Sequence, residues 1–252
     1  MKTKIPKIIH LCWLSGDKYP ENIYRCIQSW KKVMPDYEIM LWDSERFNKE
    51  IDNKFAQEAY SVRKWAFVAD YIRLFALNKY GGIYLDSDVC VYKSFDCFLQ
   101  HGFFSCIEYF KPTNYIAIEA AVMGAIPNHP FIAQCLSLYD NISFIKEDGT
   151  FEETTITMRM ANIAAKDWGF KYTPNKQDLK SEMVIYPPVT FTNPSGEFST
   201  SKTYALHLCN GSWIDKKISL TERMYLFCKR YYKNPILAFE NIYKKIVSRI
   251  KR

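Results

Sequence analysis

The segment from Phe55 to Tyr80 constrains the fold most, because its helical pattern is apolar on nearly every side. A helix of this kind is buried, so it needs other layers of structure around it. Gly81 follows at the position where a glycine ends a helix. The stretch from Ile83 to Tyr92 then predicts a strand. The sequence therefore predicts a buried helix that leads directly into a strand of the core.

The N-terminal region predicts a strand, a helix and a second strand, at residues 7–14, 20–34 and 37–42. This order is typical of a βαβ unit in a parallel sheet. Further strands are expected at residues 103–107, 115–125 and 203–207, and further helices at 129–139 and 154–168. A chain of 252 residues is long enough for one large α/β domain, with or without a small appendage.

Two acidic residues, Asp86 and Asp88, lie one residue apart in the strand predicted after Gly81. Side chains alternate along a strand, so both carboxylates are expected on the same face. Adjacent carboxylates repel each other, and a divalent cation removes that cost. Oxygen ligands suit Mg²⁺ or Mn²⁺, ions that also bind diphosphates. A single Asp-x-Asp triplet is common on protein surfaces, so its surroundings decide whether it marks a site.

Two charged residues, Asp70 and Arg73, lie inside the apolar part of the buried helix, and they share a face because they are three residues apart. Charged side chains in such an apolar helix need partners. One interpretation is a structural ion pair that anchors the helix. The other is that Arg73 binds a diphosphate through its planar guanidinium while Asp70 accepts hydrogen bonds from sugar hydroxyls.

The eight cysteines include no Cys-x-x-Cys pair, which disfavours a structural zinc site. The N-terminal sequence has too short an apolar run for a signal peptide, so reduced thiols in a cytoplasmic protein are expected. No apolar run reaches the length that spans a bilayer.

Three blocks of the sequence resemble the glycosyltransferases of family 32. The block WAFVADYIRLFALNKYGGIYLDSDV resembles their sugar-binding signature, IPKIIHLCWLSG their opening strand, and TYALHLCNGSW their closing block. The family includes bacterial capsular-polysaccharide transferases and the yeast initiating α-mannosyltransferase, and the large clostridial glucosylating toxins are more distant. The blocks occur in the family's order, and together they are specific. Two positions depart from the pattern, Ala69 where a serine is common and Leu208 where a second histidine is common.

The resemblance implies a GT-A type α/β fold, a Rossmann-like sandwich that binds a nucleotide sugar, over residues 1–214. It implies that Asp86 and Asp88 hold a Mn²⁺ or Mg²⁺ ion, with His207 as a candidate third ligand, and that Arg73 adds positive charge at the leaving diphosphate. A buried core histidine is the alternative for His207. The residues expected to bind the donor are Trp13, Ile9, Asp70, Arg73, Asn210, Ser212 and Trp213.

The implied reaction retains the configuration at the anomeric carbon. It moves a hexose or N-acetylhexosamine from a nucleotide sugar, with UDP favoured, to a hydroxyl of a glycan, with a lipid-linked intermediate of a surface polysaccharide as the expected acceptor. Glu119 is a candidate contact for the sugar or the acceptor, and a solvated surface glutamate is the favoured interpretation. Two other interpretations are a metal-dependent phosphotransferase or nucleotidyltransferase acting on a sugar, and a non-catalytic glycan-binding module.

Residues 215–252 predict a helical extension that is basic and amphipathic, with eleven Lys or Arg against two acidic residues from Lys216 onward. The preceding residues are slightly acidic overall. Such helices bind anionic membrane surfaces, which would place the enzyme at the inner face of the plasma membrane. The alternative is that the extension packs its apolar face on the domain. Nucleic acid is not an expected partner, because the body has no basic face or binding motif for it.

Overall fold

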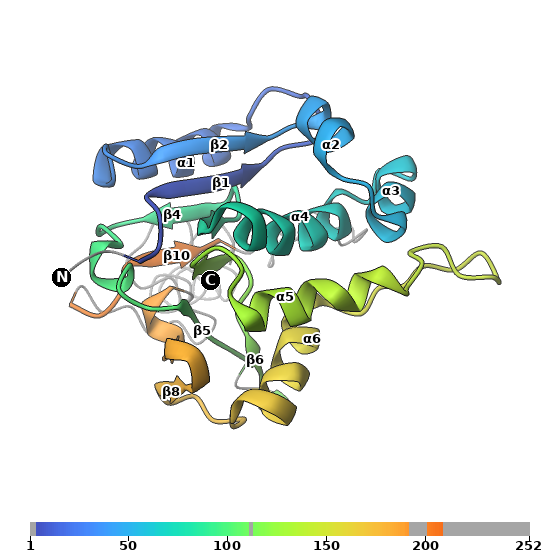
Figure 1. Cartoon of the computed structure of the whole chain (residues 1–252). Coiled ribbons are helices and arrows are strands. Elements are labelled where there is room, and N and C mark those ends of the chain that lie inside the picture. The colour runs from blue at the N-terminus through green and yellow to red at the C-terminus, as the bar shows by residue number, and fades with distance from the viewer. Residues whose placement is uncertain (1–3, 111–112, 192–200, 209–252) are drawn as a thin grey trace, which may run out of the picture.

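The computed structural model describes residues 4–110, 113–191 and 201–208 (Figure 1). Its strands are β1 Ile8–Cys12, β2 Glu38–Trp42, β3 Gly82–Leu85, β4 Val89–Val91, β5 Phe103–Phe110, β6 Tyr115–Ile118, β7 Val122–Ala125, β8 Gln177–Leu179, β9 Met183–Tyr186 and β10 Ala205–His207. Its α-helices are α1 Glu21–Val33, α2 Ser44–Glu50, α3 Lys54–Ser61, α4 Trp65–Tyr80, α5 Pro130–Ser137 and α6 Ile156–Ile163. The predicted α/β architecture is confirmed.

The main sheet has the order β2-β1-β3-β7-β5-β9-β8, with β6 paired to β5. Strand β1 is parallel to both β2 and β3, as the strand–helix–strand opening predicts, whereas β7 is antiparallel to β3 and β5. Strands β4 and β10 form a separate antiparallel pair. The described residues therefore contain a mixed sheet and a small second sheet.

The core lies on both faces of the main sheet. In β3, Ile83 and Leu85 belong to one hydrophobic cluster, which includes α1, and Tyr84 belongs to the other, which includes α4 and α5. The two clusters are separated by the alternation of side chains along the strand. Burial on both faces explains why the central strands are almost continuously apolar.

The segment from Phe55 to Tyr80 forms two helices, α3 and α4, and the prediction of mostly one helix is wrong. Arg63, between them, has a left-handed backbone with φ 57°. The backbone N–H of Lys64 bonds to the carbonyl of Ala59, which ends α3, and residues 61–63 at this junction are exposed. The predicted burial of α4 is confirmed. Its C-terminal residue is followed by Gly81, at φ 64°, whose N–H bonds to Leu77 as predicted.

The predicted strand from Ile83 to Tyr92 is interrupted, which corrects the sequence-based placement of the aspartates. Strand β3 pairs with β1 and β7 in the main sheet, whereas β4 pairs with β10, so the chain changes sheets between them. Asp86 and Asp88 lie in this connection, where the N–H of Val89 bonds to the carbonyl of Asp86 at 3.0 Å. Their relative position is set by this turn and not by alternation along one strand.

A buried histidine links β1 to the end of α4. His10 is fully buried, and its Nε2 lies 2.7 Å from the carbonyl of Gly81, while the indole Nε1 of Trp42 donates to its Nδ1 at 3.2 Å. Because the carbonyl only accepts and the indole only donates, the ring is neutral with its proton on Nε2. Burial lowers the pKa of His10 to about 4.

The neutral state of His10 makes stability depend on pH. The unfolded chain binds a proton at this residue near pH 6.5 and the folded chain only near pH 4, so the contribution is complete above pH 6.5 and decreases as the pH falls. Between pH 7.5 and pH 5 this residue is expected to remove about 2 kcal/mol from the free energy of unfolding. Urea denaturation at both pH values measures it. His10→Gln, which does not titrate, should show a smaller pH dependence, and an equal dependence in both proteins would refute the assignment.

The predicted extension at 215–252 lies outside the described residues. Within the described ranges, no helix has both the length and the apolar content that are needed to cross a bilayer.

Candidate active site

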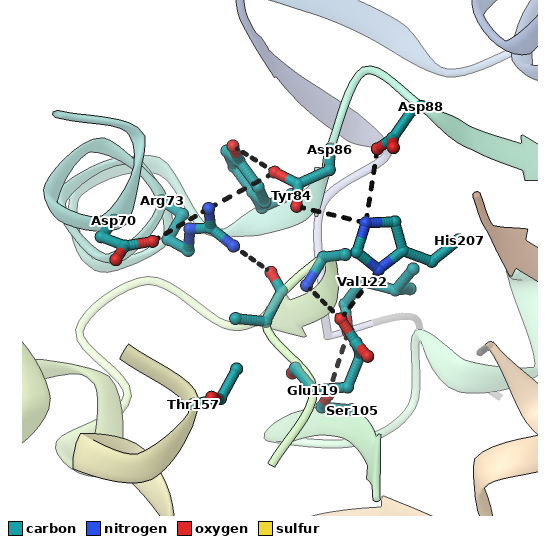
Figure 2. A network of polar contacts seen from close by, with 12 residues as sticks. Asp70, Arg73, Tyr84, Asp86, Asp88, Ser105, Glu119, Val122, Thr157 and His207 are labelled. Carbon is teal, nitrogen blue, oxygen red and sulfur yellow. Dashed lines mark hydrogen bonds and ion pairs between the residues drawn. The ribbon is translucent and has the colours of Figure 1, made fainter. Parts of the chain in front are cut away.

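Two carboxylates and one imidazole meet where β10 passes the connection between β3 and β4. The pairing of β10 with β4 sets His207 opposite Val89, directly after the Asp86–Asp88 turn. The Nε2 atom of His207 lies 3.4 Å from Oδ1 of Asp88 and 3.9 Å from Oδ2 of Asp86 (Figure 2). One ligand atom from each of the three residues lies within 4.8 Å of the other two. The predicted three-residue set is thus brought together.

Residues of β3 and α4 hold the other oxygen of Asp86. The Tyr84 hydroxyl donates to Oδ1 of Asp86 at 2.9 Å, and Nη2 of Arg73 lies 3.4 Å from the same oxygen. Its second oxygen, Oδ2, is the one nearer His207. These contacts orient the carboxylate: Oδ1 contacts Tyr84 and Arg73, and Oδ2 points toward His207.

Arg73 is buried, with only 5% of its surface exposed, and it makes several polar contacts. Its Nη1 donates to the carbonyl of Ala120 at 2.8 Å, its Nε to the carbonyl of Ala69 at 3.2 Å, and its Nη2 pairs with Asp70 at 3.1 Å. Burial alone would lower the pKa of Arg73, but the nearby carboxylates, chiefly Asp86, outweigh burial and keep it above its usual value. The structural ion pair is therefore present, and a contact of Arg73 with a diphosphate stays a prediction.

Asp70 joins two helices in addition to pairing with Arg73. Its side chain, 14% exposed, lies near the backbone N–H of Ile156 at the start of α6, a helix whose N-cap residue Thr155 makes no side-chain cap. Burial raises the pKa of Asp70 to about 6, and the Arg73 charge opposes a larger rise. A carboxylate at a helix N-terminus is favourable, so Asp70 has a structural role whether or not it binds a sugar.

Glu119 is buried, with 4% of its surface exposed, so the expectation of a solvated surface residue is wrong. Its Oε1 lies 3.4 Å from Nδ1 of His207, on the opposite side of the ring from the two aspartates. Burial would raise the pKa of Glu119, but the adjacent imidazole of His207 keeps the pKa below its usual value. The sequence offers a local indication of this burial, because Glu119 lies between the apolar residues Ile118 and Ala120, which are also buried.

The remaining predicted donor-binding residues occupy different surroundings. Trp13 is partly buried, its Nε1 donates to the carbonyl of Asp17 at 2.8 Å, and its ring packs edge-on against Tyr19 with centroids 4.9 Å apart. Ile9 is fully buried in β1 and packs in the core, which leaves its side chain no open surface to offer a donor. The last three residues of the predicted set lie outside the described residues: Asn210, Ser212 and Trp213.

The charge around the cluster fits a divalent cation. Among the described residues, the acidic side chains of Asp70, Asp86, Asp88 and Glu119 lie next to the guanidinium of Arg73 or the imidazole of His207. Two carboxylates and an imidazole nitrogen are a donor set that suits Mn²⁺, and the carboxylates alone suit Mg²⁺. A cation of charge +2 would offset the acidic excess.

Comparison with known proteins gives concordant matches. Residues 1–153 match the family of capsular polysaccharide synthesis proteins. An uncharacterised glycosyltransferase of Acanthamoeba polyphaga mimivirus is 24% identical over 242 residues, which cover 93% of this chain and 91% of that protein. Inositol phosphoceramide mannosyltransferase 3 of Schizosaccharomyces pombe is 31% identical over 147 residues, 56% of this chain and 38% of that enzyme. The chain thus spans well under half of the yeast relative.

Among solved structures, the PaToxG glycosyltransferase aligns with a TM-score of 0.47 and 20% identity, covering 65% of this chain and 70% of that chain. The galactosyltransferase LgtC, solved with donor and acceptor sugar analogues, aligns with a TM-score of 0.44 and 13% identity, covering 81% and 87%. The mixed sheet, with helices on both of its faces, confirms the α/β class that the sequence predicts. With the match covering residues 1–153 of its 252, the chain belongs to the capsular polysaccharide synthesis protein family.

Proposed function

We propose that this protein is a metal-dependent glycosyltransferase that moves a hexose or N-acetylhexosamine from a nucleotide sugar to a hydroxyl of a glycan or lipid-linked acceptor. The observation that carries the proposal is the meeting of Asp86, Asp88 and His207 within 4.8 Å, from segments far apart in the sequence. The names of the relatives, which are glycosyltransferases and mannosyltransferases, support the same reaction class.

In this proposal Asp86, Asp88 and His207 hold a Mn²⁺ or Mg²⁺ ion. When bound, the ion supplies Lewis-acid stabilisation of the negative charge on the departing nucleoside diphosphate. Asp86 is oriented for this role before any ligand arrives, because Tyr84 and Arg73 fix one of its oxygens. Groups held in place in advance need little reorganisation during the reaction, which is the main source of electrostatic catalysis.

Arg73 contributes a permanent positive charge next to the cluster. Its guanidinium is fixed by the carbonyls of Ala69 and Ala120 as well as by Asp70 and Asp86. In the proposal this charge favours the diphosphate as it leaves.

The proposed donor is a UDP-hexose or UDP-N-acetylhexosamine, and GDP-mannose is the alternative because the Schizosaccharomyces pombe relative is named a mannosyltransferase. The name of that relative also contains inositol phosphoceramide, which supports an acceptor hydroxyl on a lipid headgroup. Association with the cytoplasmic face of a membrane through residues 215–252 stays a prediction of the sequence.

A panel of nucleotide sugars tests the proposal. With Mn²⁺ present, one donor should raise Tm, because a ligand at about 100 times its Kd stabilises the folded state by about 2.7 kcal/mol. Excess chelator should remove this shift and also stop the release of nucleoside diphosphate. Undiminished turnover in chelator would exclude a metal-dependent mechanism. Release of a phosphorylated sugar or of nucleoside monophosphate would favour the phosphotransferase or nucleotidyltransferase, and binding of glycans without turnover would favour the binding module.

A further inference from the structure

The imidazole of His207 lies between two sets of carboxylates. Its Nε2 faces Asp86 and Asp88, at 3.9 Å and 3.4 Å, and its Nδ1 faces Oε1 of Glu119 at 3.4 Å (Figure 2). Glu119 is thus on the far side of the ring from the proposed cation. Among the described residues, the carboxylate of Glu119 is the acidic group that lies next to Nδ1 of His207.

The position of Glu119 is fixed by bonds that are independent of His207. The N–H of Ala121 donates to its Oε1 at 2.9 Å, and its own N–H bonds to the carbonyl of Cys106 at 2.9 Å. The buried hydroxyl of Ser105 lies 2.6 Å from the carbonyl of Glu119 and 3.0 Å from that of Val122. These contacts tie the connection between β6 and β7 to β5, so the carboxylate is held where it meets the ring.

We infer that Glu119 is a positioning residue for His207, and this inference rests on the proposed function. Glu119 accepts the Nδ1–H of His207, which leaves the lone pair of Nε2 directed at the cation held by Asp86 and Asp88. A carboxylate behind a histidine ligand fixes both the tautomer and the orientation of the ring, and it makes the ligand more basic.

The burial of Glu119 argues against a direct contact between this residue and the sugar or the acceptor. Its side chain is 5% exposed, and its Oε1 is already engaged by Ala121 and His207. Because Glu119 is buried, it can affect the site only through His207. Its removal should therefore weaken the affinity for the cation more than the affinity for the acceptor.

Cation affinity is the first test, measured by calorimetric titration of the full-length, metal-free protein with Mn²⁺. Loss of such a partner typically weakens metal binding about 10- to 100-fold, and this is expected for Glu119→Ala. Glu119→Gln keeps an oxygen that accepts from Nδ1 but loses the charge, so its Kd should lie between those of the wild type and the alanine variant.

Glu108→Gln is the matched control, because Glu108 is a buried acidic group that acts on Glu119 and His207 through its charge, whereas Glu119 lies 3.4 Å from Nδ1 of His207. Its Kd for Mn²⁺ should stay within about twofold of the wild type, since no contact with a proposed ligand is removed. An unchanged Kd in Glu119→Gln, or an equal loss in Glu108→Gln, would overturn the positioning role.

The ring itself gives a second readout that needs no variant. In ¹⁵N-labelled wild-type protein loaded with Cd²⁺, which is diamagnetic, the spectrum of His207 should show a protonated Nδ1 and a metal-bound Nε2. Binding through Nδ1 would overturn the inference even if the variants fail to fold. If the wild type binds neither Mn²⁺ nor Cd²⁺, the proposed function fails as well. If it binds both and Glu119→Gln matches it, only the positioning role fails.

Discussion

Asp88→Ala is expected to lower the rate of sugar transfer by about a thousandfold, because several kcal/mol of charge stabilisation at the leaving diphosphate depend on the cation. Asp88 is close to Nε2 of His207, at 3.4 Å, and its side chain is 13% exposed. The substitution also relieves repulsion with Asp86, so the variant should remain folded. Initial rates of nucleoside diphosphate release, measured with Tm on the same samples, test both statements.

The backbone supports this separation of activity from stability. The carbonyl of Asp88 accepts the N–H of Leu208 at 3.1 Å, and this bond between the turn and β10 survives any side-chain change. Asp96→Ala, which removes an exposed carboxylate paired with Lys7, is the control and should retain wild-type rates. Wild-type transfer by a folded Asp88→Ala protein would contradict the metal proposal.

Arg73→Ala is expected to lower the free energy of unfolding by about 3–5 kcal/mol, because it removes the buried partner of two partly buried carboxylates. Asp70 and Asp86 would lose the guanidinium, and the carbonyl of Ala120 would lose its donor. Arg73→Lys should restore only part of the loss, since an ammonium cannot reproduce contacts in four directions. Chemical denaturation at pH 7.5 gives the values.

The control for Arg73→Ala is the same substitution at an exposed arginine, Arg25. Arg25 pairs with Glu21 on the exposed face of α1, with side chains 60% and 71% exposed. Exposed pairs of this kind contribute less than about 1 kcal/mol, so Arg25→Ala should be close to the wild type. If Arg73→Ala also stays within about 1 kcal/mol, the buried network does not hold the site together.

Local patterns predict much of this fold. The apolar opening strand, the amphipathic helix after Pro20 and the glycine at position 81 each carry their signal within a few residues, and the structure confirms them. The burial of α4 follows in the same way, because a helix without a polar face has no surface to present to water.

Contacts between distant segments limit the prediction of the site. The proximity of His207 to Asp86 depends on the pairing of β10 with β4, and only the resemblance to family 32 indicated it. Alternation along one strand gave the wrong reason for the proximity of Asp86 and Asp88, because the change of sheets is set by partners elsewhere in the chain. Glu119 combines both kinds of signal: its apolar neighbours Ile118 and Ala120 indicate burial locally, whereas its contacts with Cys106 and His207 come from distant segments.

The central claim is that Asp86, Asp88 and His207 hold the cation that neutralises the leaving diphosphate. The most direct test is anomalous diffraction at the manganese edge from crystals grown with Mn²⁺ and a non-hydrolysable nucleotide sugar. The account predicts one manganese peak ligated by oxygens of Asp86 and Asp88 and by Nε2 of His207, with the diphosphate completing its shell. A donor bound elsewhere, with these three side chains in contact with water alone, would contradict it.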